Sequence, residues 1–336
     1  MFVSSVMDRI SSMQKLAMAA LLMMLGSTAL ANTDEEAITW LEGMADAAHQ
    51  LSYIGTFVYQ QGDNLQTMRI IRSVTDEGEY ERLVSMSGQN REVIRAQDKV
   101  TCILPEDSSI VIEQASSPRP FTAIPIERLA LLGEYYAIQM GGKARIADLN
   151  TRQIDIIPRD QYRFGQRLWL EEQSRLLLRS EVFNERGEVI EKLLFTSLEI
   201  RDHIPVEMLQ PNIAAGDQIL ELDRGLMHRR GSSHAQASWQ TSSLPPGFQQ
   251  KVLRRHYLPN KFSQVEHHVY GDGLASVSVF IEERDDEDEV VIGPSRMGGI
   301  NVYGQLSNGH LITVLGEVPM VTVQFIAEAM QPIVRP

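Results

Sequence analysis

The feature that most constrains the fold is a run of short β-strand patterns between residues 53 and 200. About twelve segments rich in β-branched and aromatic residues follow one another, separated by short polar turns. One short helical pattern at 126–132 interrupts them, so the regular strand–helix alternation of a doubly wound parallel sheet is missing. Such a meander predicts a mainly antiparallel α+β unit whose sheet curves into an unclosed barrel, with a β-sandwich as the alternative.

An amphipathic helix precedes these strands. Ile38, Leu41 and Met44 recur at helical spacing, which predicts an apolar face that packs on the sheet. Thr33 and Glu36 have the spacing of a capping box, so the helix is expected to begin near Thr33. The expected strands lie at 53–59, 65–74, 80–86, 91–95, 100–104, 110–113, 135–140, 144–148, 153–157, 167–171, 176–184 and 189–200.

A second, smaller unit follows a small and polar stretch at 229–238, which is typical of a linker. Strands are expected at 262–270, 274–283, 300–306 and 310–315, and a helix after Pro319. Asn308-Gly309 between the last two strands predicts a tight hairpin. We therefore expect a large domain at 32–210, a linker at 211–238 and a small antiparallel-sheet-and-helix domain at 239–336.

Residues 1–31 have the pattern of a secretory signal peptide. A basic start with Arg9 and Lys15 leads into an apolar run at 16–25, and the small residues Ala29 and Ala31 flank Leu30. Cleavage before Asn32 would export the chain, in a bacterium to the periplasm. The single cysteine, Cys102, excludes an intramolecular disulfide and is expected to be buried in a strand.

Chemical motifs are scarce. The sequence holds no nucleophile elbow, metalloprotease helix or phosphate-binding loop. His267 and His268 are adjacent, so on a strand they face opposite sides and cannot chelate one metal together. The acidic run at 282–289 is better explained as a solvated hairpin tip than as a calcium loop. We therefore predict a protein that is not an enzyme and has no metal or cofactor, and the formal charge of −13 argues against nucleic acid as a partner.

A curved sheet with helices on its concave face can enclose an apolar cavity. The residues expected to line it are Phe57, Phe164, Leu168, Trp169, Leu170, Leu177, Phe183 and Phe195. Arginines near the sheet rim could meet the phosphates of an amphiphile: Arg69, Arg72, Arg145, Arg163 and Arg167. The pattern leaves two readings open, since the apolar residues could equally fill an ordinary core and the arginines could pair with surface carboxylates.

Several segments taken in order carry a family resemblance. They are 52–59, 91–95, 158–170, 244–248 (Leu-Pro-Pro-Gly-Phe), 272–280 (Asp-Gly-Leu-Ala-Ser-Val-Ser-Val-Phe) and 313–319. Together, after a signal peptide, they resemble the MucB/RseB family of sigma-E regulators. Two positions depart from the family's pattern, Gly271 in place of serine and Asp148 where a glycine often follows Arg-Ile-Ala, which puts local turn geometry in doubt.

The resemblance implies a large domain like the lipoprotein carriers LolA and LolB, with a small domain docked on it. It implies binding to the periplasmic part of a MucA/RseA-like anti-sigma factor, protection of that factor from site-1 protease, and release by lipopolysaccharide or a lipid fragment. Lipid contacts are assigned to Phe57, Phe164, Leu168, Trp169, Leu177, Phe195, Arg69, Arg72 and Arg145. Partner contacts are assigned to Asp272, Leu274, Phe280 and Glu317. The alternative is a periplasmic lipoprotein or lipid carrier, and the oligomeric state stays open, a homo-oligomer included.

Overall fold

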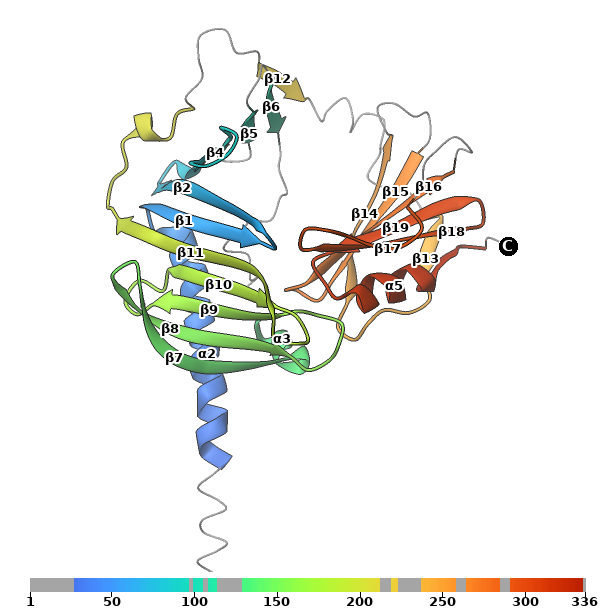
Figure 1. Ribbon diagram of the computed structural model, residues 1–336, viewed down its shortest axis with the longest axis horizontal. Helices are drawn as coiled ribbons and strands as arrows, with labels where there is room; N and C mark the ends of the chain where they lie inside the picture. The colour runs from blue at the N-terminus through green and yellow to red at the C-terminus, as the bar shows by residue number, and fades with distance from the viewer. Residues whose placement is uncertain are drawn as a thin grey trace, which may run out of the picture.

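The computed structural model describes residues 27–96, 99–104, 108–113, 129–211, 219–222, 237–257, 264–284 and 291–334. They form two units, each built on its own β-sheet, as Figure 1 shows. The leader at 1–26, most of the expected linker and most of the acidic run at 282–289 lie outside the described residues. The cleavage site and the domain boundaries therefore stay predictions.

Within the described residues, the large unit has a 12-stranded sheet in the order β12-β6-β5-β4-β3-β2-β1-β11-β10-β9-β8-β7. Its strands are β1 (Tyr53–Gln61), β2 (Asn64–Thr75), β3 (Gly78–Ser85), β4 (Glu92–Ala96), β5 (Lys99–Leu104), β6 (Ser108–Glu113), β7 (Tyr136–Ile146), β8 (Leu149–Pro158), β9 (Gly165–Glu171), β10 (Leu177–Phe183), β11 (Val189–Ile200) and β12 (Ile219–Leu222). β12 pairs in parallel with β6, and the other neighbours pair antiparallel. The sheet ends at β7 and β12 without closing, which confirms the predicted unclosed antiparallel sheet.

In the described part of the large unit, the α-helices α2 (Ser27–Gln50) and α3 (Leu129–Tyr135) and the short 3-10 helix η2 (Val206–Met208) accompany this sheet. Figure 1 shows α2 running across strands β7 to β11. One core cluster joins the helices to the sheet through Ala37, Leu41, Met44, Leu132, Tyr136, Ile138, Ile154, Ile156, Leu168 and Leu170. The helix begins at Ser27, so the predicted start at Thr33 is wrong because the helical turns continue N-terminally of it.

Strand β7 corrects another expectation. The sequence predicts two strands, at 135–140 and 144–148, because Gly141 and Gly142 interrupt the β pattern. The structure forms one strand whose register to β8 shifts between Met140 and Lys143. The glycines thus mark a bulge within a strand, a common role for glycine in sheets.

Over its described residues, the small unit has a six-stranded antiparallel sheet in the order β14-β15-β16-β19-β18-β17. Its strands are β14 (Gln249–Tyr257), β15 (Gln264–Gly271), β16 (Ser276–Glu283), β17 (Gly293–Met297), β18 (Ile300–Ser307) and β19 (His310–Gly316). Helix α5 (Met320–Ala329) packs on β18 and β19 and starts after Pro319, as predicted. The short strands β13 (Trp239–Thr241) and β20 (Met330–Pro332) pair with each other.

The Asn308-Gly309 hairpin is confirmed. Both residues have positive φ, 50° and 74°, as a tight turn between twisted strands requires. The turn between β7 and β8 has the same character, with φ of 50° at Ala147 and 68° at Asp148. The chain therefore forms this turn without the glycine that the family often places there. None of the helices in the described part of the chain is long and apolar enough to span a bilayer.

Candidate functional site

The two units meet at a buried arginine. Arg163 lies between β8 and β9 of the large unit, and its side chain is 0% exposed. Its Nη1 donates to Asp272 Oδ2 at 2.9 Å, and its Nη2 donates to the Pro246 carbonyl at 2.5 Å. Its Nε donates to Asp160 Oδ1 at 3.1 Å. Because Asp272 and Pro246 belong to the small unit, Arg163 joins the two units.

Asp272 is the reciprocal residue in the turn between β15 and β16. Its Oδ2 also accepts the Tyr136 hydroxyl at 3.0 Å, and its Oδ1 accepts the N–H groups of Leu274 and Ala275, each at 2.8 Å. Burial raises the pKa of Tyr136, and the charge of Asp272 raises it further. Tyr136 therefore stays protonated and acts as a donor to the carboxylate.

Aromatic rings surround the guanidinium. The Arg163 Cζ lies 4.9 Å from the Tyr135 ring centroid, 5.3 Å from that of Tyr136 and 5.4 Å from that of Phe248. Rings at this range attract a cation electrostatically, most strongly where water is excluded. Gly247 has a φ of +80°, and a Cβ there would lie 2.5 Å from the Tyr135 ring, so the Leu-Pro-Pro-Gly-Phe turn needs glycine at this point.

Helix α5 extends the contact. Thr322 Oγ1 donates to the Tyr162 carbonyl at 2.8 Å, and the Tyr162 and Phe325 rings meet edge-on at 5.6 Å. Leu274 of the small unit packs against the core cluster of the large unit. The contact thus combines a buried ion pair with apolar packing.

A second contact between the units is like-charged. The Gln61 amide lies against the β17–β18 turn, where a Cβ added at Gly298 would come within 2.7 Å of Gln61 Oε1. The same amide donates to Glu191 Oε2 at 3.5 Å. Burial raises the pKa of Glu191, and the charge of Glu317 in the small unit raises it further. Burial also raises the pKa of Glu317. These two carboxylates repel each other across the contact.

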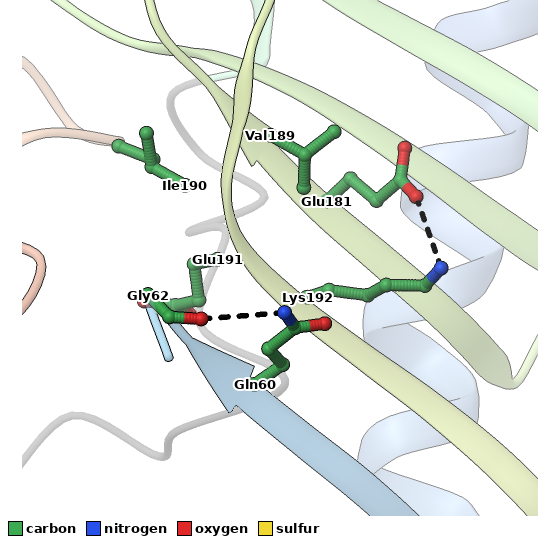
Figure 2. A pocket seen from close by; sticks show the side chains of 7 residues that line it. All are labelled: Gln60, Gly62, Glu181, Val189, Ile190, Glu191 and Lys192. Atoms are coloured by element: carbon green, nitrogen blue, oxygen red, sulfur yellow. Dashed lines mark hydrogen bonds and ion pairs between the residues drawn. The ribbon is translucent and has the colours of Figure 1, made fainter. Parts of the chain in front are cut away.

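An open groove lies beside this second contact, shown in Figure 2. Gln60, Gly62, Glu181, Val189, Ile190, Glu191 and Lys192 line it. Lys192 Nζ lies 3.6 Å from Glu181. These two residues belong to a row of alternating charges that crosses four neighbouring strands: Asp155, Arg167, Glu181 and Lys192. Each charge has an opposite neighbour, so the row stabilises the sheet.

The predicted lipid-contact side chains lie mostly in the core. Phe57, Phe164, Leu168, Trp169 and Phe195 are buried, and Leu177 is half-buried against the core cluster around α2. Leu170 and Phe183 are also buried. The Phe57 and Phe195 rings lie 5.4 Å apart, within a second cluster that includes Ala47 of α2. An acyl chain could therefore reach these residues only by displacing side chains or α2.

The predicted phosphate-contact arginines are scattered. Arg69 is exposed on β2, and Arg145 is exposed and paired with Asp148. Arg72 is buried instead, contacts Glu79 and Glu81, and donates to the Ala48 carbonyl at the end of α2. Arg72 therefore ties the helix to the sheet and presents no open face to a phosphate. Arg167 lies in the row of alternating charges.

Two of the four predicted partner-contact residues lie in the contact between the units, and two lie outside the ion-paired contact. Asp272 and Leu274 lie in the contact between the units. Phe280 is half-buried on β16 and stacks on His267, with ring centroids 4.2 Å apart. Glu317 lies beside the second contact, where its charge raises the pKa of Glu191. Cys102 is half-buried on β5 rather than fully buried, and burial raises the pKa of its thiol.

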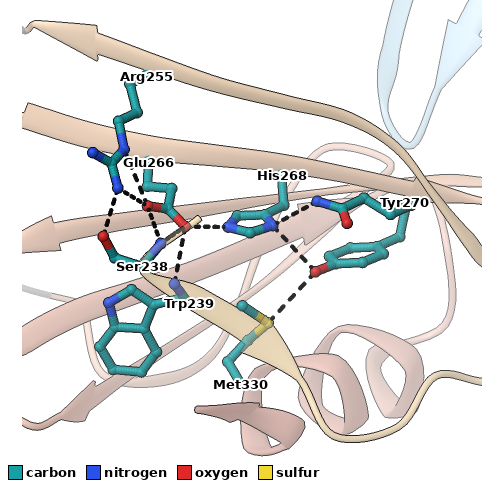
Figure 3. A network of polar contacts seen from close by, with 8 residues as sticks. Ser238, Trp239, Arg255, Glu266, His268, Tyr270 and Met330 are labelled. Carbon is teal, nitrogen blue, oxygen red and sulfur yellow. Dashed lines mark hydrogen bonds and ion pairs between the residues drawn. The ribbon is translucent and has the colours of Figure 1, made fainter. Parts of the chain in front are cut away.

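A polar network anchors the start of the small unit, as Figure 3 shows. Glu266 accepts the N–H groups of Ser238 and Trp239, at 3.0 and 3.1 Å, and pairs with Arg255 at 2.9 Å. His268 Nε2 lies 2.8 Å from Glu266, and its Nδ1 lies within hydrogen-bonding distance of Gln250 and Tyr270. His267 and His268 do face opposite sides of β15, as expected. Across the described residues no group of three ligand-type side chains is placed to hold a metal.

Sequence comparison matches both units to one family. The model of the MucB/RseB N-terminal domain matches residues 36–213, and that of the MucB/RseB C-terminal domain matches residues 233–331. The chain belongs to the MucB/RseB family. The resemblance inferred from short segments is thereby confirmed over residues 36–213 and 233–331.

Individual relatives carry regulatory names. Pseudomonas aeruginosa MucB, named as a sigma factor AlgU regulatory protein, is 29% identical over 93% of this chain and 97% of its own length. Escherichia coli RseB, named as a sigma-E factor regulatory protein, is 24% identical over 86% of this chain and 88% of its own. The MucB/RseB family is regulatory, in agreement with the prediction of a protein that is not an enzyme.

Solved MucB structures share the fold. The complex of Pseudomonas aeruginosa MucA and MucB matches with a TM-score of 0.71 at 27% identity, over 89% of this chain and all of that one. MucB alone matches with a TM-score of 0.61 at 27% identity, over 89% of this chain and 98% of that one.

The sequence does not indicate the buried Arg163 contact. It predicts Arg163 only as one of the arginines near the rim of the sheet.

Proposed function

We propose that this protein is a periplasmic regulator that binds the periplasmic part of a membrane-spanning anti-sigma factor and shields it from site-1 protease. The supporting observation is the similarity of both units to MucB, including MucB solved in complex with the periplasmic part of MucA. The signal-peptide pattern at 1–31 supports export, and cleavage before Asn32 would release the mature chain.

Lipopolysaccharide or a lipid fragment is proposed as the releasing signal. A lipid that binds one conformation better needs to change partner affinity by only about 1–3 kcal/mol to produce a roughly 5–150-fold effect. In the large unit, α2 covers the apolar residues assigned to lipid, so acyl-chain binding would couple to a movement of this helix. That coupling supplies a route from lipid binding to partner release.

A protease-protection assay tests the proposal. The periplasmic segment of the host's anti-sigma factor is incubated with site-1 protease, with and without the mature chain, and its cleavage rate is followed. The expected result is slow cleavage with the chain present and recovery of cleavage when lipopolysaccharide is added. Lipid binding without any protection would instead support the lipid carrier. Unchanged cleavage and no lipid binding would contradict both functions, and the chain would then share only its fold with the family.

A further inference from the structure

Two hydrogen-bond donors of the large unit converge on one oxygen atom. Arg163 Nη1 and the Tyr136 hydroxyl lie 2.9 and 3.0 Å from Asp272 Oδ2. Arg163 is held from its own side by Asp160, and Tyr135 lies against its guanidinium face. The two donors, Asp160 and Tyr135 all belong to the large unit, whereas Asp272 belongs to the small unit. The donors therefore have partners within the large unit, in addition to the Pro246 carbonyl and the Phe248 ring that the small unit supplies to Arg163.

Each half of the ion pair also keeps a partner of its own. If the units separate, Arg163 retains Asp160, and Asp272 Oδ1 retains the N–H groups of Leu274 and Ala275. A buried charge that loses its only partner is costly, which normally makes a buried ion pair permanent. Here separation exposes both charges to water while leaving each with hydrogen bonds. The contact is built so that it can open.

We propose that Arg163 and Tyr136 form a carboxylate-binding site on the large unit, which Asp272 of the small unit occupies as a releasable latch. The ligand that would compete for this site is an acidic side chain of a peptide. The pairing of a fixed guanidinium with a hydroxyl donor suits a carboxylate oxygen. The aromatic rings around Arg163 exclude water and leave little room for the full hydration shell of an inorganic anion.

The tethered Asp272 has an advantage over any free ligand. A group on the same chain as its site acts at an effective concentration set by its linker, which is of order millimolar for a short flexible linker and lower for a longer one. A competing acidic peptide must exceed that value or gain further contacts elsewhere. Opening is therefore a response to a specific peptide rather than to any anion in solution.

The first experiment measures the latch directly. With Cys102 replaced by Ser, spin labels are placed at the exposed positions Glu185→Cys in the large unit and Leu306→Cys in the small unit. The parent should give one narrow distance distribution. Asp272→Asn keeps an oxygen for the turn N–H groups but presents an amide NH₂ to Arg163. We expect this variant to show a second, broad population.

Two further variants make the result specific. Tyr136→Phe removes one hydrogen bond to Asp272 and should give a smaller open population than Asp272→Asn. Glu92→Gln breaks a partly buried pair with Arg82 inside the large unit, at 3.0 Å, and should leave the distance unchanged. An unchanged distribution in Asp272→Asn, or an equal change in Glu92→Gln, would overturn the latch.

The second experiment tests the site with N-acetyl-aspartate amide as the probe. Titration calorimetry should detect binding to the Asp272→Asn variant that is at least about tenfold tighter than to the parent, equivalent to about 1.4 kcal/mol. N-acetyl-asparagine amide should not bind, and inorganic phosphate should bind more weakly than the aspartate probe. Equal binding by parent and variant, no binding by the variant, or stronger binding of phosphate would each contradict a carboxylate site.

Discussion

Replacing Glu266 by Gln is predicted to weaken the anchor at the start of the small unit. The carboxylate accepts the N–H groups of Ser238 and Trp239 and pairs with Arg255 and His268. Gln keeps the length of the side chain and one acceptor oxygen. It loses the negative charge. Its NH₂ group is a donor, so it cannot accept the hydrogen bonds that the second carboxylate oxygen accepted. The substitution therefore tests the charge rather than the packing.

The expected loss of stability follows from the lowered pKa of Glu266. Burial by itself raises the pKa of Glu266, but the hydrogen bonds from His268, Ser238, Arg255 and Trp239 outweigh it and lower the pKa from 4.5 to about 2. That lowering corresponds to about 3 kcal/mol of stability at neutral pH, present above the unfolded value and lost as the pH falls toward 2. We expect Glu266→Gln to cost about 2–3 kcal/mol at pH 7, and the difference to narrow by about 1 kcal/mol at pH 3.5.

The assay is urea unfolding followed by the fluorescence of Trp239, which is buried in the small unit. Replacing Trp40 and Trp169 by Phe leaves it as the single tryptophan of the three in the chain. Glu199→Gln is the control, because Glu199 pairs with Arg201 on the surface, where solvent screens the pair, and its loss should cost much less stability than the loss of Glu266. A Glu266→Gln cost within the control's range, or a cost that does not shrink at pH 3.5, would refute the reasoning.

Three further substitutions have defined outcomes. Gly165→Ala places a Cβ 2.1 Å from the Phe183 ring and should destabilise the large unit by about 1–3 kcal/mol in urea unfolding. Phe57→Ala empties a fully buried site and should cost about 3–5 kcal/mol in the same assay. Glu317→Gln removes the charge that helps raise the pKa of Glu191, so thermal stability should rise where both carboxylates are ionised, and the gain should vanish as the pH falls and both become protonated.

Matched variants separate these effects from general damage. Gly142→Ala has no heavy atom within 4 Å of the added Cβ and should cost much less than Gly165→Ala. Glu185→Gln removes an exposed charge and should not reproduce the gain of Glu317→Gln. Equal effects within either pair would contradict the local explanations. For Phe57, a loss below about 1 kcal/mol would show that the core around Phe195 is looser than the ring contact implies.

Local chemistry explains which elements the sequence predicts. The Asn308-Gly309 turn and the start of α5 at Pro319 follow from backbone preferences that a few residues express. Strand β14 (Gln249–Tyr257) escapes prediction because Lys251, Arg254 and Arg255 hide its alternation. Its polar side chains pair with neighbours once the sheet forms, as Arg255 does with Glu266. Such pairing forms only when β14 and β15 lie side by side in the sheet.

The candidate site depends even more on contacts that the local sequence does not predict. Arg163 and Asp272 are 109 residues apart, and nothing near either residue indicates that they meet. Arg72 looks like a free rim arginine in the sequence, but its burial depends on how α2 ends above β2. Recognition of the family came from ordered segments, several of which the structure places at contacts between the units. The contacts themselves needed the three-dimensional arrangement.

The most direct test of the regulatory account is a binding titration. The chain from Asn32 onward is titrated by calorimetry with the purified periplasmic segment of its host's anti-sigma factor. The account predicts a saturable complex with a dissociation constant of about 1 μM or tighter, equivalent to about −8 kcal/mol. Absence of heat and of any complex at roughly a hundred times that concentration would contradict it.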